Sequence, residues 1–296
     1  MDKRVIALLA AFGASLIYAV NHTIAKGVMP TYIKPFGFIL LRVLGATILF
    51  WAVSFWAPKQ KIEKTDWSRF IICAFFGMVF NMLMFFKGLQ LSTPINSSVI
   101  ITISPILVFI LSAIFINEKI TFLRVIGILL GFSGAIGLIL FGNEIRLDAP
   151  NIPLGNLMLA SNAVAYAVYL ILIKPLTVKY HPITLMKWLF LIGLIANIPI
   201  TFHEFKEVTW GSLPIHVIWK MAFVVVGTTF FTYLLNIVAL KTLKASTLGA
   251  FIYLQPLLAI GFAITMGADS LTLVKIICAL LVLFGVYLVS RKKKLT

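Results

Sequence analysis

Acidic residues are scarce in this sequence, which has nine Asp and Glu against 25 Lys and Arg in 296 residues. Charged residues of both signs make up only 11% of the chain, whereas 61% of it is hydrophobic. A water-soluble chain of this length cannot bury so much apolar surface, because the fraction of surface buried on folding levels off near roughly three quarters. The composition therefore excludes a water-soluble protein and predicts one that lies in a lipid bilayer.

Cysteine is almost absent as well. Cys73 and Cys278 lie far apart in apolar stretches, which excludes a disulfide framework and a zinc cluster, so we expect no metal and no cofactor. A net charge of +16 would indicate nucleic acid in a soluble domain, but loops of membrane proteins collect cations on the cytoplasmic side. The expected partners are the lipid bilayer and a small molecule, not nucleic acid, and the oligomeric state is left open.

Long apolar runs, in contrast, are abundant. A helix needs about 17 to 25 mostly apolar residues to cross a bilayer. Ten runs meet this requirement and predict an all-α polytopic membrane protein. The runs cover residues 5–25, 36–56, 70–86, 95–116, 125–141, 154–173, 183–201, 221–240, 245–266 and 271–290. We interpret the first run as a retained span and not as a cleaved signal peptide, because no cleavage site follows it.

The distribution of cations predicts the orientation of these spans. If the N-terminus lies in the cytoplasm, the cytoplasmic segments carry 16 Lys and Arg and the outer segments carry 5. Cytoplasmic loops are enriched in Lys and Arg, so we expect both termini in the cytoplasm, and an even number of spans agrees with this. The expected location is the cytoplasmic, or inner, membrane of a bacterium.

The chain also contains an internal repeat. The segment SPILVFILSAIFINEKIT of the fourth span aligns with QPLLAIGFAITMGADSLT of the ninth at an offset of 151 residues. This register pairs Pro105 with Pro256, Glu118 with Asp269, and Gly134 with Gly285. Because each half holds five spans, the second half must cross the membrane in the opposite sense. We therefore predict two inverted five-helix repeats, residues 1–143 and 144–296, as in secondary transporters.

The motifs of the two halves carry a family resemblance. The first half holds Tyr18-Ala-Val-Asn21, Arg42, Ser104-Pro105 and Asn117-Glu118-Lys119, and the second half holds Gly227-Thr228, Tyr253-x-Gln255-Pro256 and Asp269. Their order and spacing resemble the EamA family of the drug/metabolite transporter superfamily, as two repeats that cover nearly the whole chain. The resemblance implies a ten-helix transporter of small metabolites. It also implies a central cavity lined by the first, third, fourth, sixth, eighth and ninth spans.

Polar residues at helical spacing within the spans are the candidates for lining that cavity, because a polar group that faces lipid is unfavourable. One wall of the cavity is expected to be polar, and Met78, Met82 and Phe85 are expected to form an apolar wall opposite. The candidate substrate-binding residues are Tyr18, Asn21, His22, Asn81, Ser98, Thr102, Asn162, Tyr166, Tyr169, Thr229, Tyr233, Asn236, Tyr253 and Gln255. The same side chains could instead form hydrogen bonds between helices.

Four other residues have more than one interpretation. Pro105 and Pro256 remove backbone hydrogen bonds, which gives either a gating hinge or only a bent helix. His22 could exchange a proton or form a hydrogen bond to a neighbouring helix. Arg42 could attract a carboxylate, extend to the headgroups or pair with a loop acid.

No span contains a carboxylate, which disfavours antiport of organic cations. We therefore predict a secondary transporter that moves a small metabolite by alternating access, with amino acids or their derivatives as the leading class and efflux as the direction. Nucleotide, sugar and multidrug transport remain alternatives, as does a channel. An intramembrane enzyme is a further alternative, because Gly131-Phe-Ser133-Gly134 matches the G-x-S-G of rhomboid proteases, but a catalytic role is not expected in a Gly-rich packing helix.

Overall fold

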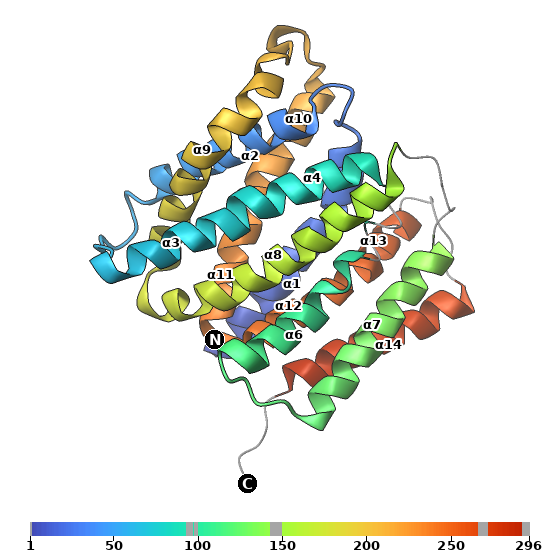
Figure 1. Cartoon of the computed structure of the whole chain (residues 1–296). Coiled ribbons are helices and arrows are strands. Elements are labelled where there is room, and N and C mark those ends of the chain that lie inside the picture. The colour runs from blue at the N-terminus through green and yellow to red at the C-terminus, as the bar shows by residue number, and fades with distance from the viewer. Residues whose placement is uncertain (1, 93–96, 98–99, 143–149, 266–271, 292–296) are drawn as a thin grey trace.

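The computed structural model describes residues 2–92, 97, 100–142, 150–265 and 272–291. All regular secondary structure in these residues is helical, which confirms the all-α prediction (Figure 1). The first half contains α1 (Lys3–Lys26), α2 (Pro35–Val53), η1 (Lys64–Asp66), α3 (Trp67–Ala74), η2 (Phe75–Phe80), α4 (Asn81–Leu91), α6 (Ser104–Phe115) and α7 (Phe122–Gly142).

Within the described residues, the second half repeats this order of elements and has α12 and η5 in addition, before α13. It contains α8 (Ile152–Lys179), α9 (Pro182–Lys206), η3 (Trp210–Ser212), α10 (Ile215–Phe223), η4 (Val224–Phe231), α11 (Thr232–Thr242), α12 (Ala245–Ala250), η5 (Phe251–Tyr253), α13 (Leu254–Thr265) and α14 (Leu273–Ser290). The predicted boundary between the halves, at residue 143, lies outside the described residues.

In the described part of the chain, nine helices are long and apolar enough to cross a membrane. The predicted span 95–116 contains the shorter apolar helix α6 together with residues that the structure does not describe. Apolar side chains face outward along the bundle, and Ile114, Leu157 and Leu280 are 60–65% exposed. Such exposure is unfavourable in water but not in lipid, so the fold is that of a multi-pass membrane protein.

Helix ends differ by several residues from the ends of the apolar runs. The sixth predicted span stops at residue 173, but α8 continues to Lys179 with Pro175 inside it. Hydropathy marks where the side chains stop being apolar, whereas a helix continues until its backbone leaves the helical region. In α8 this happens at Tyr180, which is extended with φ −116° and ψ 153°.

Both ends of the described chain lie on one face of the bundle. The Arg4 guanidinium donates a hydrogen bond to the Ser290 carbonyl, which joins the start of α1 to the end of α14. We call this side the termini face and the other side the opposite face. An even number of crossings requires this arrangement, so the pairing of the ends agrees with ten spans.

The helix contacts follow an approximate twofold symmetry. In the first half α4 packs against α8, and the equivalent contact in the second half joins α11 to α1. Likewise α6 packs on α8 and α13 packs on α1, whereas α2 packs on its own counterpart α9, and α7 on α14 (Figure 1). The two repeats are therefore interlocked, and each contributes helices to the packing of the other.

Irregular helix turns also occur at equivalent positions in the two halves. The third span contains the π-helix η2 at Phe75–Phe80 and the eighth span contains the π-helix η4 at Val224–Phe231. In the fourth and ninth spans, α6 and α13 begin at Ser104 and Leu254, one or two residues before the paired prolines. Proline fits the first turn of a helix because the N–H it lacks has no acceptor there.

Glycine lets α7 and α14 approach closely. A Cβ added to Gly134 would lie 2.6 Å from the Cys278 carbonyl oxygen, and one added to Gly285 would lie 2.5 Å from the Gly131 nitrogen. Side-chain carbons do not tolerate such distances. The small residues of the predicted packing face are thus required by close backbone contact between these two helices.

Candidate functional site

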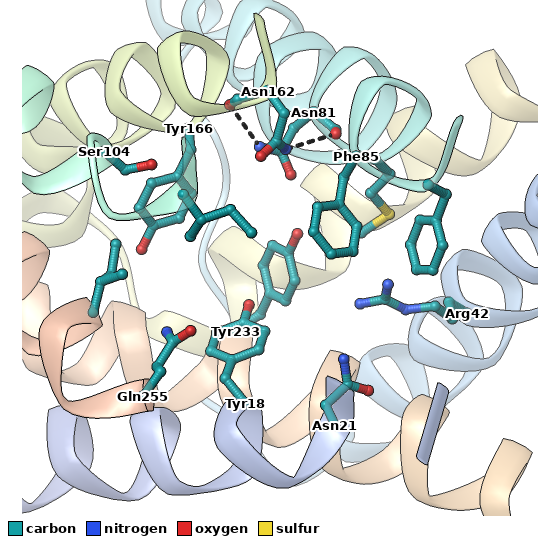
Figure 2. Close-up of a pocket in the computed structure, with 14 residues that line it drawn as sticks. Tyr18, Asn21, Arg42, Asn81, Phe85, Ser104, Asn162, Tyr166, Tyr233 and Gln255 are labelled. Atoms are coloured by element: carbon teal, nitrogen blue, oxygen red, sulfur yellow. Dashed lines mark hydrogen bonds between the residues drawn. The ribbon is translucent and has the colours of Figure 1, made fainter. Parts of the chain in front are cut away.

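A cavity lies inside the bundle where helices of both repeats meet (Figure 2). Its open volume is about 110 Å³, which is room for several waters or a small ligand. The cavity is lined by Tyr18, Asn21, Arg42, Asn81, Met82, Phe85, Phe86, Ile101, Ser104, Asn162, Tyr166, Tyr233, Ile252 and Gln255. These residues come from the six spans that the resemblance implied and also from the second span, through Arg42.

The cavity lies nearer to the opposite face than to the termini face. Asn21 is five residues from the end of α1 and Arg42 is seven from the start of α2, which places them roughly 8 and 10 Å from the ends of these helices on that side. On the other side of the cavity, toward the termini face, the Ser15 hydroxyl donates to the Phe251 carbonyl at 3.0 Å, and α12 packs against α6.

Two asparagines bridge the repeats at the edge of the cavity. The Asn162 amide donates to the Asn81 carbonyl at 2.9 Å, and the Asn81 amide donates to the Asn162 carbonyl at 3.3 Å. Figure 2 shows this reciprocal pair between α4 and α8. The pair serves as an interhelical contact and still leaves the two side-chain carbonyl oxygens at the cavity wall.

The π-helices explain several other polar contacts. A π-helix shifts hydrogen bonds to i→i+5 and leaves carbonyls to be satisfied by side chains. The Tyr233 hydroxyl donates to the Gly77 carbonyl of η2 at 3.2 Å, and the Thr232 hydroxyl donates to the Gly227 carbonyl of η4 at 3.0 Å. A glycine of each π-helix thus accepts a side-chain hydrogen bond, and Tyr233 links the eighth span to the third.

Aromatic hydroxyls and one amide are available to a ligand. Among the described residues, the Tyr18 and Tyr166 hydroxyls and the Gln255 amide have no hydrogen-bond partner, and all three side chains are partly exposed to the cavity. Asn21 accepts a hydrogen bond from the Thr228 hydroxyl at 2.9 Å, which orients its amide. The site can therefore form several neutral hydrogen bonds with a bound molecule.

The apolar wall is present at Met82 and Phe85, as expected, and is extended by Phe86. Met78, which was expected there too, is fully buried and packs beneath Gly193 instead. The cavity thus combines hydroxyl and amide groups with soft apolar surface, which suits an amphipathic molecule.

The structure places the sequence candidates in three groups. The candidates that line the cavity are Tyr18, Asn21, Asn81, Asn162, Tyr166, Tyr233 and Gln255. Those with described side chains outside the lining are Thr102, Tyr169, Thr229, Asn236 and Tyr253, and of these Tyr169 packs on Gly77 and Tyr253 on Gly131. Ser98 and the His22 side chain lie outside the described residues. Binding of substrate by the lining residues stays a prediction.

The candidate list omits several lining residues: Arg42, Ser104, Phe86, Ile101 and Ile252. Ser104 was visible in the Ser-Pro motif, and Phe86 lies four residues after Met82 on the expected apolar wall. Arg42 carried a signal as well, since it is an arginine well inside an apolar run of a chain whose spans contain no acid. Ile101 and Ile252 have no such signal, because isoleucine is ordinary in a span.

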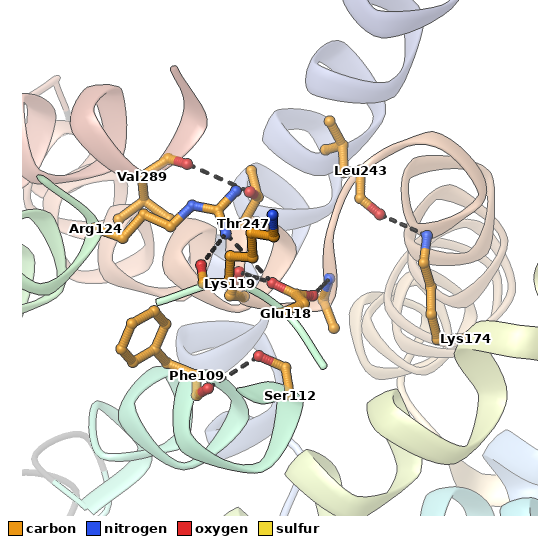
Figure 3. Close-up of polar contacts among 11 residues, drawn as sticks. Phe109, Ser112, Glu118, Lys119, Arg124, Lys174, Leu243, Thr247 and Val289 are labelled. Atoms are coloured by element: carbon orange, nitrogen blue, oxygen red, sulfur yellow. Dashed lines mark hydrogen bonds and ion pairs between the residues drawn. The ribbon is translucent and has the colours of Figure 1, made fainter. Parts of the chain in front are cut away.

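Glu118 joins the two repeats at the termini face (Figure 3). Its carboxylate accepts hydrogen bonds from the Ala245 backbone at 2.9 Å and the Ser246 hydroxyl at 2.5 Å, which caps the start of α12. Arg124 lies 3.7 Å away as an ion pair. Burial lowers the pKa of Lys244 beside this cluster, and repulsion by Arg124 lowers it further. We call Glu118, Arg124, Ala245 and Ser246 the Glu118 cluster.

A second link on this face comes from Lys174. Its ammonium donates to the carbonyls of Leu240 and Leu243, at the end of α11, with the latter bond at 2.7 Å. A cation at a helix C-terminus is stabilised by the exposed carbonyls. Together with the Glu118 cluster, this contact ties α6, α7 and α8 to the α11–α12 turn (Figure 3).

The opposite face has a corresponding contact between the second and seventh spans. Glu204 accepts hydrogen bonds from the Phe36 and Gly37 amides at 2.7 and 3.2 Å, which caps α2. Lys34 and Glu207 form an ion pair at 2.6 Å. This contact raises the pKa of Lys34 and lowers that of Glu207, although both groups are exposed and the pair stabilises the fold little.

The G-x-S-G tetrapeptide lies in α7, where Gly131 and Gly134 pack against neighbouring helices and Ser133 is exposed on the outer surface. Ser133 does not line the cavity. Within the described residues, no three His, Cys, Asp or Glu side chains come together in a way that could hold a metal ion.

The inverted helical repeat and the cavity between its halves define the class as a polytopic membrane transporter. A model of the EamA-like transporter family matches residues 5–140 and 153–291, and the chain belongs to this family. The two matched segments correspond to the two repeats.

Relatives that align with most of this chain are also named transporters. An uncharacterized transporter of Archaeoglobus fulgidus is 28% identical over 292 residues, which cover 98% of both chains. YyaM, an uncharacterized transporter of Bacillus subtilis, is 26% identical over 78% of this chain and 75% of its own. A solved crystal structure with 17% sequence identity superposes with a TM-score of 0.78 over 96% of each chain, which shows the shared fold.

Proposed function

We propose that this protein is a secondary transporter that moves a small metabolite across the cytoplasmic membrane by alternating access. Amino acids or their derivatives are the leading substrate class, and efflux is the proposed direction. The observation that carries the proposal is the cavity between the repeats, which combines apolar surface with tyrosine hydroxyls that have no hydrogen-bond partner among the described residues.

Alternating access requires a cavity that is closed toward one side at a time. The cavity lies nearer to the opposite face, while the Glu118 cluster and the Ser15 contact hold the helices together toward the termini face. The interlocked packing of α1 with α11 and of α4 with α8 gives two equivalent bundles. Rocking of one bundle against the other would exchange the open and closed sides.

The orientation in the membrane is part of the proposal. The termini face carries Arg4, Lys119, Arg124, Lys179 and Lys244, and the sequence places 16 Lys and Arg on this side. The positive-inside rule then puts the termini face in the cytoplasm. In this orientation the cavity would be nearer to the outside, as in a state that releases an exported substrate.

The test is counterflow in liposomes. Purified protein is first screened for thermal stabilisation by amino acids, nucleosides, sugars and organic anions, and each stabilising compound is then assayed for saturable exchange. Tyr166→Leu changes the cavity wall and should abolish exchange. Asn236→Leu lies outside the lining and should leave exchange within about twofold of the original rate.

Three results would contradict the proposal. The first is the absence of saturable exchange with every stabilising compound. The second is flux without saturation, which indicates a channel. The third is equal loss of exchange in the Tyr166 and Asn236 variants, which would mean that the described cavity is not the transport site.

A further inference from the structure

We propose that Arg42 binds a carboxylate, so that the substrate is a small monoanionic organic acid or an amino acid held by its carboxylate. This inference rests on the proposed function and specifies the chemistry of the same cavity. It starts from the surroundings of one guanidinium group.

Arg42 is held with most of its donors unused. Its Nε donates to the Thr229 hydroxyl at 2.9 Å, and its guanidinium carbon lies 4.9 Å from the centre of the Phe86 ring. The Thr229 hydroxyl in turn donates to the Val224 carbonyl at 2.8 Å. Of the five N–H donors of arginine, the four on Nη1 and Nη2 have no acceptor among the described residues.

No acid neutralises this charge in the described part of the chain. Arg42 is only 5% exposed, yet the ion pairs of the described residues all lie near the two faces of the bundle and none includes it. A buried charge without a partner is costly. The side chain does not extend to the surface either, since Thr229 and Phe86 hold it beside the cavity.

The geometry fits a carboxylate. Figure 2 shows the Arg42 guanidinium directed into the cavity from α2, across from Ser104 and Gln255. Two parallel N–H groups of a guanidinium bind both oxygens of a carboxylate. The contact with the Phe86 ring helps to hold the guanidinium in position. The neutral groups across the cavity would then contact the far end of the substrate.

The charge count favours a monoanion. Among the described lining residues, Arg42 is the one Lys or Arg, and none is acidic. A monoanion brings the site to neutrality, a zwitterionic amino acid leaves it with one positive charge, and a phosphate monoester would leave about one negative charge in excess. The apolar surface of Met82, Phe85 and Phe86 suits an aliphatic or aromatic body between the two polar ends.

Charge neutralisation also links binding to the transport cycle. While the cavity is open, water can solvate the guanidinium. When the helices close over it, water leaves and the charge needs a counter-ion. A bound carboxylate supplies that counter-ion, so the loaded transporter changes sides more easily than the empty one, and exchange is faster than net flux.

The first arm of the test uses the unaltered protein and matched ligand pairs. N-acetylphenylalanine, N-acetylleucine and phenylalanine are compared with their primary amides by thermal shift and by counterflow in liposomes. We expect the acids to bind about 10- to 100-fold more tightly than the amides, as hydrogen bonds between charged groups do. Amides or phosphate monoesters that bind as well as the acids overturn the proposal, as does a failure of all three acids to bind.

The second arm changes Arg42. Arg42→Lys keeps the charge but not the two parallel N–H donors, and should weaken binding of the tightest-binding acid about tenfold. Arg42→Gln should abolish the preference for acid over amide. Lys87→Gln removes a cation on the same side of the bundle but outside the cavity lining, and should leave the affinities for acids and amides unchanged. Melting without ligand reports whether each variant is folded. If folded Arg42→Gln still prefers acids, the proposal is wrong.

The two proposals fail in different ways. If the unaltered protein exchanges a neutral or cationic compound but does not bind acids, the transport proposal is supported and the proposed role of Arg42 is wrong. If the protein binds acids through Arg42 but shows no saturable exchange, the binding chemistry stands and the transport proposal falls.

Discussion

Two tyrosines on α8 illustrate how the role of a residue depends on its neighbours. Tyr166 and Tyr169 are three residues apart and look equivalent on a helical stripe. Tyr166 lines the cavity, whereas Tyr169 is 4% exposed and its ring packs against Gly77. Because α8 contacts α4 on one side and faces the cavity on the other, a small rotation around its axis separates a binding group from a packing group.

Removal of single hydroxyls should separate these roles. Tyr166→Phe deletes a donor that the described protein leaves unpaired and should weaken substrate binding about 3- to 10-fold, the value of one neutral hydrogen bond. Tyr169→Phe keeps the ring against Gly77 and should leave affinity unchanged. Isothermal titration with a stabilising compound measures both. Equal losses in the two variants would contradict the assignment of the cavity wall.

The sequence identified nine of the fourteen lining residues: seven because polar side chains within a span should not face lipid, and Met82 and Phe85 because they form the expected apolar wall. It could not separate Thr229 from Tyr233, which are four residues apart. The Thr229 hydroxyl forms hydrogen bonds with Arg42 and with a carbonyl of its own helix. The Tyr233 hydroxyl instead donates to the Gly77 carbonyl in the third span. Which neighbour a stripe meets is set by tertiary packing, and helical periodicity carries no information about it.

At the scale of elements, α7 and α14 form the closest helix pair with a glycine interface. Gly285→Ala would place a carbon 2.5 Å from the Gly131 nitrogen and 2.6 Å from the Gly127 oxygen. Overpacking of this kind costs about 1–3 kcal/mol, so the melting temperature should fall by several degrees. Gly261→Ala, with no atom within 4 Å of the added carbon, is the control and should melt like the original. A tolerated Gly285→Ala would refute the contact.

At the same scale, the Glu118 cluster is the contact that would keep the termini face closed in the proposed transport cycle. Glu118→Ala removes the cap of α12 and the charge opposite Arg124, so the α6–α7 and α11–α12 turns should separate more often. In protein whose two native cysteines are replaced by alanine, Ile252→Cys lines the cavity. Its labelling by an impermeant maleimide from the termini side should rise several-fold when Glu118→Ala is added.

A matched acid on the same face provides the control. Glu63 shares Lys179 with Asp66 and is 61% exposed, so Glu63→Gln leaves an ion pair in place. It should not alter the labelling of Ile252→Cys. Labelling that is the same in the Glu118 and Glu63 variants would mean that the cluster has no part in closing this face.

The pairing of Glu118 with Asp269 by register correctly drew attention to an acid at the end of the fourth span, but not to its partners. The Ala245 amide and the Ser246 hydroxyl belong to the other repeat, 127 and 128 residues away. A repeat alignment shows which residues are equivalent. It does not show which residues of one copy touch the other copy, and that information comes from the fold.

At the scale of the whole molecule, the proposed orientation can be mapped directly. Lys61→Cys lies in the loop before α3 on the termini face, and Gly211→Cys lies in the exposed η3 turn on the opposite face. In cells, an impermeant maleimide should label Gly211→Cys but not Lys61→Cys until the membrane is broken. The reverse pattern would invert the orientation, and labelling of both would contradict the span count.

The paired π-helices bear on the history of the chain. Each hydrogen bond of a π-helix spans one more residue than in an α-helix, and such turns are rare. Here they occur at Phe75–Phe80 and Val224–Phe231, at matched places in the third and eighth spans, with a glycine at position 77 in one and 227 in the other. The simplest history is that an ancestral five-helix gene already encoded the extra residue, and that both descendants inherited it when that gene doubled.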